Sequence, residues 1–139
     1  MKNAAEIRKV VEGRAAGRCE YCLCPARLSP GPFAVEHIQP SSAGGGDETD
    51  NLAWSCSGCN GHKLTATTAA DPRTNRRAAL YHPRRDEWAA HFQWGDGGLT
   101  LVGNTPTGRA TIERLKINRS NVVGLREVLI KVGQHPPGE

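Results

Sequence analysis

The stretch CSGCNGHK, residues 56–63, carries two cysteines separated by two residues and followed directly by an asparagine. A second pair with the same spacing, CEYC, lies upstream at residues 19–22. Two such knuckles offer four thiolates, a ligand set well suited to tetrahedral zinc. The spacing therefore predicts a zinc site, with two disulfides or four buried thiols as the alternative. The predicted ligands are Cys19, Cys22, Cys56 and Cys59.

A site closed by four sulfurs has no open coordination position, so this zinc is expected to hold the fold and to take no part in chemistry. Such a staple suits the composition of the chain. Its 139 residues are 37% hydrophobic and include 16 Gly and 9 Pro, which predicts much loop and a small core. The fifth cysteine, Cys24, has no partner at knuckle spacing and is interpreted as a spare thiol that can compete as a ligand.

The charge of the chain is modestly basic, with a net +4 and a pI near 9.0. This excess fits a polyanionic partner such as nucleic acid. The N-terminal residues lack the apolar core of a signal peptide, and no run approaches the roughly 20 apolar residues that span a membrane. We expect a cytoplasmic protein with no membrane contact, in a reducing setting where paired cysteines bind metal.

The residue patterns predict a mixed α+β chain. Apolar spacing and turn residues favour a helix over 3–16, a strand over 33–37, a turn-rich loop over 41–50, a helix over 60–67, a β-hairpin over 91–103 and helices over 107–118 and 122–132. We expect a core at residues 1–70 and an extension at residues 71–139, packed on the same domain. The extension would comprise a basic connector, the hairpin and the two terminal helices.

Four pieces in order, CEYC, VEHIQP, GGGDETDNL and CSGCNGHK, resemble the HNH endonuclease family in its subgroup with two zinc knuckles. The resemblance covers about residues 19–64. It implies a small ββα-metal core, also called a His-Me finger, stapled by the four-cysteine zinc site. It also implies hydrolysis of DNA with a divalent metal ion.

Position by position, the first histidine of the family corresponds to His37 and its asparagine to Asn51. The third position falls on Asn60, where many members have histidine, so this chain resembles the HNN variant. Glu36 occupies the acidic position, where aspartate is commoner. The resemblance thus implies a catalytic set of Glu36, His37, Asn51 and Asn60.

Phosphodiester chemistry gives each of these residues a role. A neutral imidazole at His37 can take a proton from water at pH 7, and Asn51 can orient the ring through its side chain or its carbonyl. Glu36 and Asn60 can hold Mg²⁺ or Mn²⁺ as the catalytic cation. Because neighbours on a strand point to opposite faces, Glu36 and His37 are expected where the strand bends or ends.

Basic residues near this motif are candidates for contacts with backbone phosphates, with a solvated surface as the alternative. They are Lys63, His62, Arg76, Arg77, Arg84 and Arg85.

The function expected from the sequence is an endonuclease acting on single- or double-stranded DNA. The alternative is a catalytically inactive, zinc-stapled nucleic-acid-binding module, and a third reading is an RNA-associated zinc protein. A chain this short is expected to obtain specificity from a protein partner or a homodimer, through its terminal helices.

Overall fold

The computed structural model describes residues 3–138 and divides into two compact units. The first unit runs to Thr67 and includes the short segment His82–Arg85, while the second comprises Thr68–Tyr81 and the chain from Asp86 onward. No pattern in the sequence predicts that residues 82–85 return to the first unit. Within residues 3–138, no helix has the length and apolar character needed to cross a membrane.

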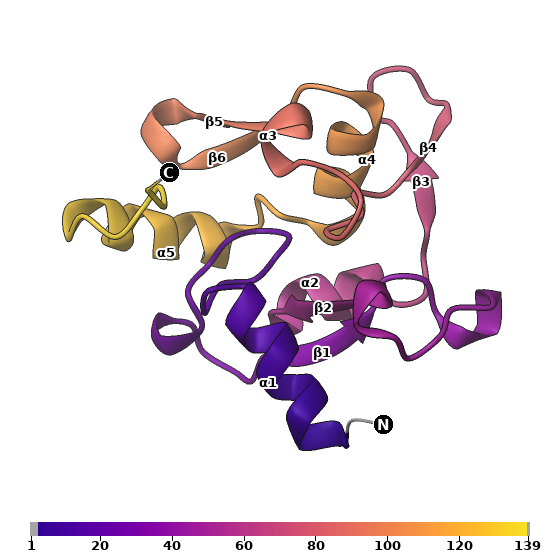
Figure 1. The fold of residues 1–139 in the computed structure, drawn as a ribbon. Helices are drawn as coiled ribbons and strands as arrows, with labels where there is room; N and C mark the ends of the chain where they lie inside the picture. Colours follow the sequence, from indigo (N-terminus) through magenta and orange to yellow (C-terminus); the bar gives the residue numbers. More distant parts are fainter. Residues whose placement is uncertain (1–2, 139) are drawn as a thin grey trace. The chain divides into compact units, whose positions relative to one another are not determined.

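The first unit is built on a β-hairpin followed by a helix (Figure 1). Strands β1 (Ala34–His37) and β2 (Leu52–Ser55) pair antiparallel, with Ala34 opposite Ser55 and His37 opposite Leu52. Helix α2 (Ser57–Lys63) follows directly and packs on β1. This β1–β2–α2 order is the small mixed fold that the sequence predicted.

Helix α1 (Ala4–Arg14) packs on both strands of this hairpin and confirms the predicted N-terminal helix. Its start is set by a capping box, in which the Asn3 side chain accepts from the Glu6 amide while the Glu6 side chain accepts from the Asn3 amide. Val11 is the fully buried residue of this helix. The helix ends before Ala16 and Gly17, which both have positive φ.

Helix α2 begins earlier than predicted. The sequence suggested a helix from Asn60 to about Thr67, whereas the structure has Ser57–Lys63. The reason is that the second knuckle is itself the first turn of the helix, because the Cys56 side chain accepts from the Cys59 amide at 3.4 Å. Leu64 ends the helix with a φ of 52°.

The second unit contains two β-hairpins and three α-helices among its described residues. The elements are β3 (Thr68–Ala70), β4 (Arg77–Ala79), α3 (Trp88–His91), β5 (Phe92–Gly95), β6 (Thr100–Gly103), α4 (Pro106–Leu115) and α5 (Ser120–Lys131). The hairpin of β5 and β6 and the helices α4 and α5 confirm the sequence prediction, while the hairpin of β3 and β4 replaces part of the expected connector.

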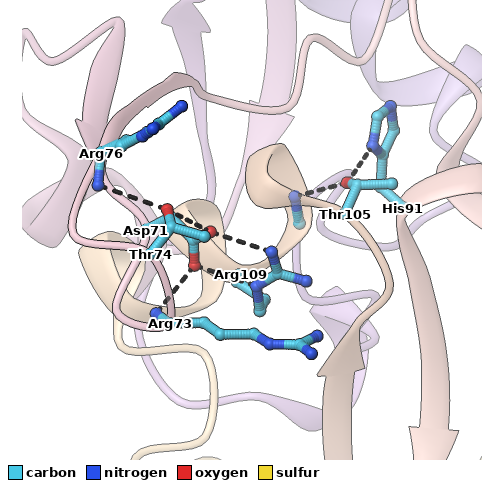
Figure 2. A network of polar contacts seen from close by, with 8 residues as sticks. Asp71, Arg73, Thr74, Arg76, His91, Thr105 and Arg109 are labelled. Atoms are coloured by element: carbon cyan, nitrogen blue, oxygen red, sulfur yellow. Dashed lines mark hydrogen bonds and ion pairs between the residues drawn. The ribbon is translucent and has the colours of Figure 1, made fainter.

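The turn between β3 and β4 is organised by Asp71, which is fully buried (Figure 2). Its carboxylate accepts from the Arg73 amide and the Thr74 hydroxyl, and both oxygens accept from the Arg109 guanidinium of α4 at 2.9 Å. The hydrogen bonds from Arg109 hold the pKa of Asp71 well below its usual range. This contact ties the hairpin to α4 within the second unit.

The core of the second unit also contains a charged side chain. Arg126 of α5 is 2% exposed, and its guanidinium donates to the carbonyls of Leu99 and Ile117 and to the Asn118 side chain, each at 3.0 Å. The apolar residues in and next to α4 and α5 divide between core and surface. Leu115 and Ile117 are fully buried, whereas Val128 and Val132 are exposed.

Candidate functional site

The four knuckle cysteines form one buried cluster in the first unit, as predicted. Their sulfur atoms all lie within 4.8 Å of one another, and the Cys22 and Cys56 sulfurs are 3.8 Å apart. Tetrahedral zinc with bonds of about 2.3 Å places its sulfur ligands roughly 3.8 Å apart. The cluster therefore has the dimensions of a four-cysteine zinc site, and all of these cysteines are free thiols.

Hydrogen bonds among the thiols of the cluster shift their pKa values in both directions. The contact with Cys19 lowers the pKa of the Cys56 thiol and raises that of the Cys22 thiol. A bound dication would stabilise all four as thiolates, which is the chemistry that a structural zinc supplies. Cys24 lies beside them, with its sulfur 3.3 Å from that of Cys22, but does not belong to the four-member cluster.

The cluster joins the segment after α1 to the hairpin. The Glu20 amide donates to the Trp54 carbonyl at 2.9 Å, and the Glu20 side chain accepts from the Trp54 amide at 3.0 Å. Glu20 also forms an ion pair with Arg84 from the returning segment. The first knuckle is thus anchored to β2 by its backbone as well as by any bound metal.

His37 is the last residue of β1, and its side chain is 41% exposed. Its Nε2 atom lies 2.7 Å from Oδ1 of Asp47, in the glycine-rich loop. An ionised carboxylate can only accept, so Nε2 is the donor in this contact, and in the neutral ring Nδ1 then keeps its lone pair. Within residues 3–138 the Nδ1 atom has no hydrogen-bond partner. A neutral His37 in this tautomer is able to accept a proton from a water molecule.

Asn51 closes the loop that carries Asp47. Its side chain accepts from the Gln39 amide and donates to the Gln39 carbonyl, both at 2.9 Å, and it donates to the Gly46 carbonyl at 2.8 Å. Its own carbonyl accepts from the Ile38 amide at 2.9 Å. The contacts of Asn51 are therefore with the backbone on either side of the loop, and the residue that contacts the His37 ring is Asp47.

Glu36 points to the opposite face of β1 and is 5% exposed. Its Oε2 atom accepts from the Tyr21 hydroxyl at 2.7 Å, and its Oε1 atom forms an ion pair with the Lys63 ammonium at 2.5 Å. Burial raises the pKa of Glu36, while Lys63 and Tyr21 oppose that shift. Burial together with the charge of Glu36 raises the pKa of Tyr21 well above its ordinary value. The strand ends at His37 as expected, but the alternation of β1 separates the two side chains.

Asn60 and Lys63 are three residues apart on α2, so they share the face of the helix that is turned toward β1. Asn60 is half-buried, while His62, between them, is exposed. The Lys63 ammonium reaches the Glu36 carboxylate and the carbonyls of Ile38 at 3.0 Å and His37 at 3.4 Å. The helix thus brings the Lys63 ammonium to the hairpin.

The remaining basic candidates differ in what they contact. Arg76 and Arg85 are exposed, and the exposed Arg77 donates to the side chain and carbonyl of Thr68. Arg84 is 14% exposed and paired with Glu20. Lys63 and Arg84 have internal carboxylate partners, so neither belongs to the phosphate contacts proposed below.

Sequence reasoning missed two members of this site, Asp47 and Tyr21. Asp47 is one of three acidic residues in the loop, and nothing in the local pattern distinguishes it from its neighbours Glu48 and Asp50. Tyr21 lies inside the first knuckle, and its spacing to the flanking cysteines does not indicate a contact with Glu36.

The first unit thus combines a β-hairpin and a helix with four clustered cysteines that could bind a metal, a histidine at the end of the first strand and an asparagine on the helix. The family model for HNH endonuclease matches residues 19–65, which confirms the resemblance seen in the sequence. The matched segment holds all four cysteines and the residues Glu36, His37, Asn51 and Asn60. Neither the curated proteins nor the solved structures include a match to this chain.

Proposed function

We propose that this protein is an endonuclease that hydrolyses DNA phosphodiester bonds with His37 as the general base. The observation that carries the proposal is the arrangement of His37, whose Nε2 is held by Asp47 at 2.7 Å while Nδ1 is without a partner in the described chain. Nuclease function is typical of the family whose model matches this segment.

In the proposed reaction the Nδ1 atom of His37 takes a proton from the attacking water. The Asp47 carboxylate accepts from Nε2 and stabilises the imidazolium that results. Asn51 positions both partners, because it bonds the backbone at Gln39, next to the end of β1, and at Gly46, next to Asp47. Loss of a general base typically lowers a rate by about 10²- to 10⁴-fold.

The proposed cation is Mg²⁺ or Mn²⁺, held by Glu36 and Asn60. The donors are hard oxygen atoms of the kind these ions prefer, so the chemistry of the set fits such an ion. When bound, the cation would act as a Lewis acid toward a phosphate oxygen. The zinc at the four cysteines would remain structural.

The proposed substrate contacts are the exposed basic residues His62, Arg76, Arg77 and Arg85. Contacts of this kind bind the phosphate backbone without reading sequence and weaken as salt is added. Sequence choice would then need a protein partner or a second copy of the chain. The proposed surface for that contact is the exposed Val128 of α5 together with the exposed Val132, which directly follows the helix.

A specific observation favours the alternative, a nucleic-acid-binding module without turnover. Both carboxylate oxygens of Glu36 have an internal partner, one in the Tyr21 hydroxyl and the other in the Lys63 ammonium, so the charge of the carboxylate is already neutralised within the protein. The alternative predicts DNA binding with no cleavage in any divalent metal.

The test is a supercoiled-plasmid nicking assay on zinc-loaded protein, with Mg²⁺, Mn²⁺ or EDTA. Wild type is compared with His37→Ala and with His82→Ala, a matched control outside the site. We expect metal-dependent nicking by the wild type and the control, with loss in His37→Ala at unchanged zinc content and unchanged circular dichroism. Nicking by His37→Ala near the wild-type rate would overturn the role of His37, and binding without nicking by the wild type would select the alternative.

A further inference from the structure

The most unusual charged group of the first unit is Lys63, which is only 1% exposed. A buried lysine is costly unless its ammonium is paired and hydrogen-bonded. Here the ammonium lies 2.5 Å from Oε1 of Glu36, 3.0 Å from the Ile38 carbonyl and 3.4 Å from the His37 carbonyl. These three oxygen atoms lie around the ammonium.

This oxygen cage has the chemistry of a cation site. One carboxylate and two backbone carbonyls are hard donors, the same kinds of atom that bind Mg²⁺ and Ca²⁺ in proteins. The half-buried Asn60, on the same face of α2 as Lys63, can add an amide oxygen. In this structure the cation that these oxygens surround is the ammonium of the protein itself.

The cage carries a single negative charge, from Glu36. Tyr21 adds a hydrogen bond to Oε2 but no charge. One carboxylate neutralises one ammonium, so a dication in the same place would meet the Lys63 charge at close range in a site shielded from water. The two cations therefore exclude each other.

We propose that Lys63 is an internal, exchangeable counter-ion of this cage, and that a divalent cation binds Glu36 only by displacing the Lys63 ammonium. This cation is the one that the proposed nuclease would use, so the relevance of the inference to catalysis rests on the proposed function. Lys63 is suited to leave, because it is the last residue of α2 and carries its charge on a flexible four-carbon stem. Leu64, which follows it, is exposed and outside the helix.

Two consequences distinguish this proposal from a purely structural ion pair. The protein without a divalent cation keeps Glu36 neutralised, so its fold does not depend on that cation. Divalent cations bind more weakly than they would bind to the same oxygen atoms without Lys63, because binding includes the free-energy cost of expelling the Lys63 ammonium. A competition of this kind typically changes affinity by roughly 5- to 150-fold.

The first experiment measures Mn²⁺ binding to zinc-loaded protein by electron paramagnetic resonance, which needs no turnover. The variants are Lys63→Met, Glu36→Gln with Lys63→Met, and Lys9→Met, a control that removes an exposed lysine of α1. We expect Lys63→Met to bind Mn²⁺ about tenfold more tightly or better than the wild type. The control should match the wild type, and the double variant should lose this binding. Equal affinity of Lys63→Met and the wild type would overturn the proposal.

A second experiment uses the wild-type protein and avoids the chance that Lys63→Met fails to fold. A buried, hydrogen-bonded ammonium exchanges slowly enough with water to give an ¹⁵N NMR signal, whereas an exposed one does not. We expect the Lys63 signal to disappear as Mg²⁺ is added, with the circular dichroism unchanged. Persistence of that signal at saturating Mg²⁺ would overturn the proposal. Neither readout requires nicking, so a protein that shows the exchange and cleaves no DNA would refute the proposed nuclease alone.

Discussion

The contact between Asp47 and His37 allows the proposed base to be tested without removing it. Asp47→Ala removes the carboxylate that holds Nε2 at 2.7 Å, and Asp47→Asn keeps an oxygen acceptor while removing the charge. Both variants leave the His37 side chain and the four cysteines in place. Any loss of rate then reports the orientation and electrostatic support of the ring.

The exposure of the pair sets the size of the expected effect. Asp47 is 90% exposed and His37 41% exposed, so water screens the charge and competes for the hydrogen bond. Exposed pairs of this kind contribute up to about 1 kcal/mol. Since 1.36 kcal/mol corresponds to tenfold in rate, Asp47→Ala should lower nicking by roughly fivefold. Asp47→Asn should fall between Asp47→Ala and the wild type. A buried aspartate behind a catalytic histidine is worth about 10⁴-fold, which is far more.

The assay compares initial nicking rates at saturating plasmid for the wild type, both Asp47 variants, His37→Ala and the control Asp50→Asn. Asp50 is another exposed acid of the same loop. A rate for Asp47→Ala equal to that of the wild type would refute the orienting role of Asp47. A rate as low as that of His37→Ala would show that Asp47 does more than orient the ring, and the magnitude reasoned from its exposure would be wrong.

Two further predictions concern the fold of each unit. Cys59→Ser removes one proposed zinc ligand. Because structural zinc contributes about 10–16 kcal/mol to the folding of small domains, the variant should lose its zinc, measured by metal analysis. The first unit should also lose its cooperative unfolding, measured by circular dichroism. Cys24→Ser, outside the four-member cluster, should keep both, and retained zinc in Cys59→Ser would contradict the assignment. In the second unit, the hydrogen bonds from Arg109 lower the pKa of Asp71 in the folded state. The ionised carboxylate therefore stabilises the fold at pH values above the unfolded-state pKa of Asp71, which is near 3.9. This stabilisation is lost as the pH falls toward the lower folded-state pKa. In thermal unfolding at pH 7, the wild type should therefore have a higher Tm than Asp71→Asn. The difference in Tm should narrow as the pH is lowered from about 5. A difference in Tm that does not depend on pH would refute this role of Asp71.

Much of the first unit was predictable because its signals are local. The cysteine spacing predicted all four members of the cluster. Strand β1 was predicted by the apolar run before His37 and by the turn residues after it. The predicted start of helix α2 was too late in the chain because the second cysteine knuckle also forms the first helical turn, which spacing alone does not reveal. The hairpin of β3 and β4 was missed because its strands are three residues each, too short for alternation to show.

The sequence by itself determined which residue types are present for metal binding and for proton transfer, since these depend on side-chain chemistry and short spacings. Only the tertiary structure decided how they pair. His37 meets Asp47 because the loop held by Asn51 folds back on the end of β1. Glu36 meets Lys63, far along the chain, because the alternation of β1 turns it away from His37 and toward α2. A buried charge is stable only beside a group of opposite charge, and the folded chain determines which such groups lie close enough to pair.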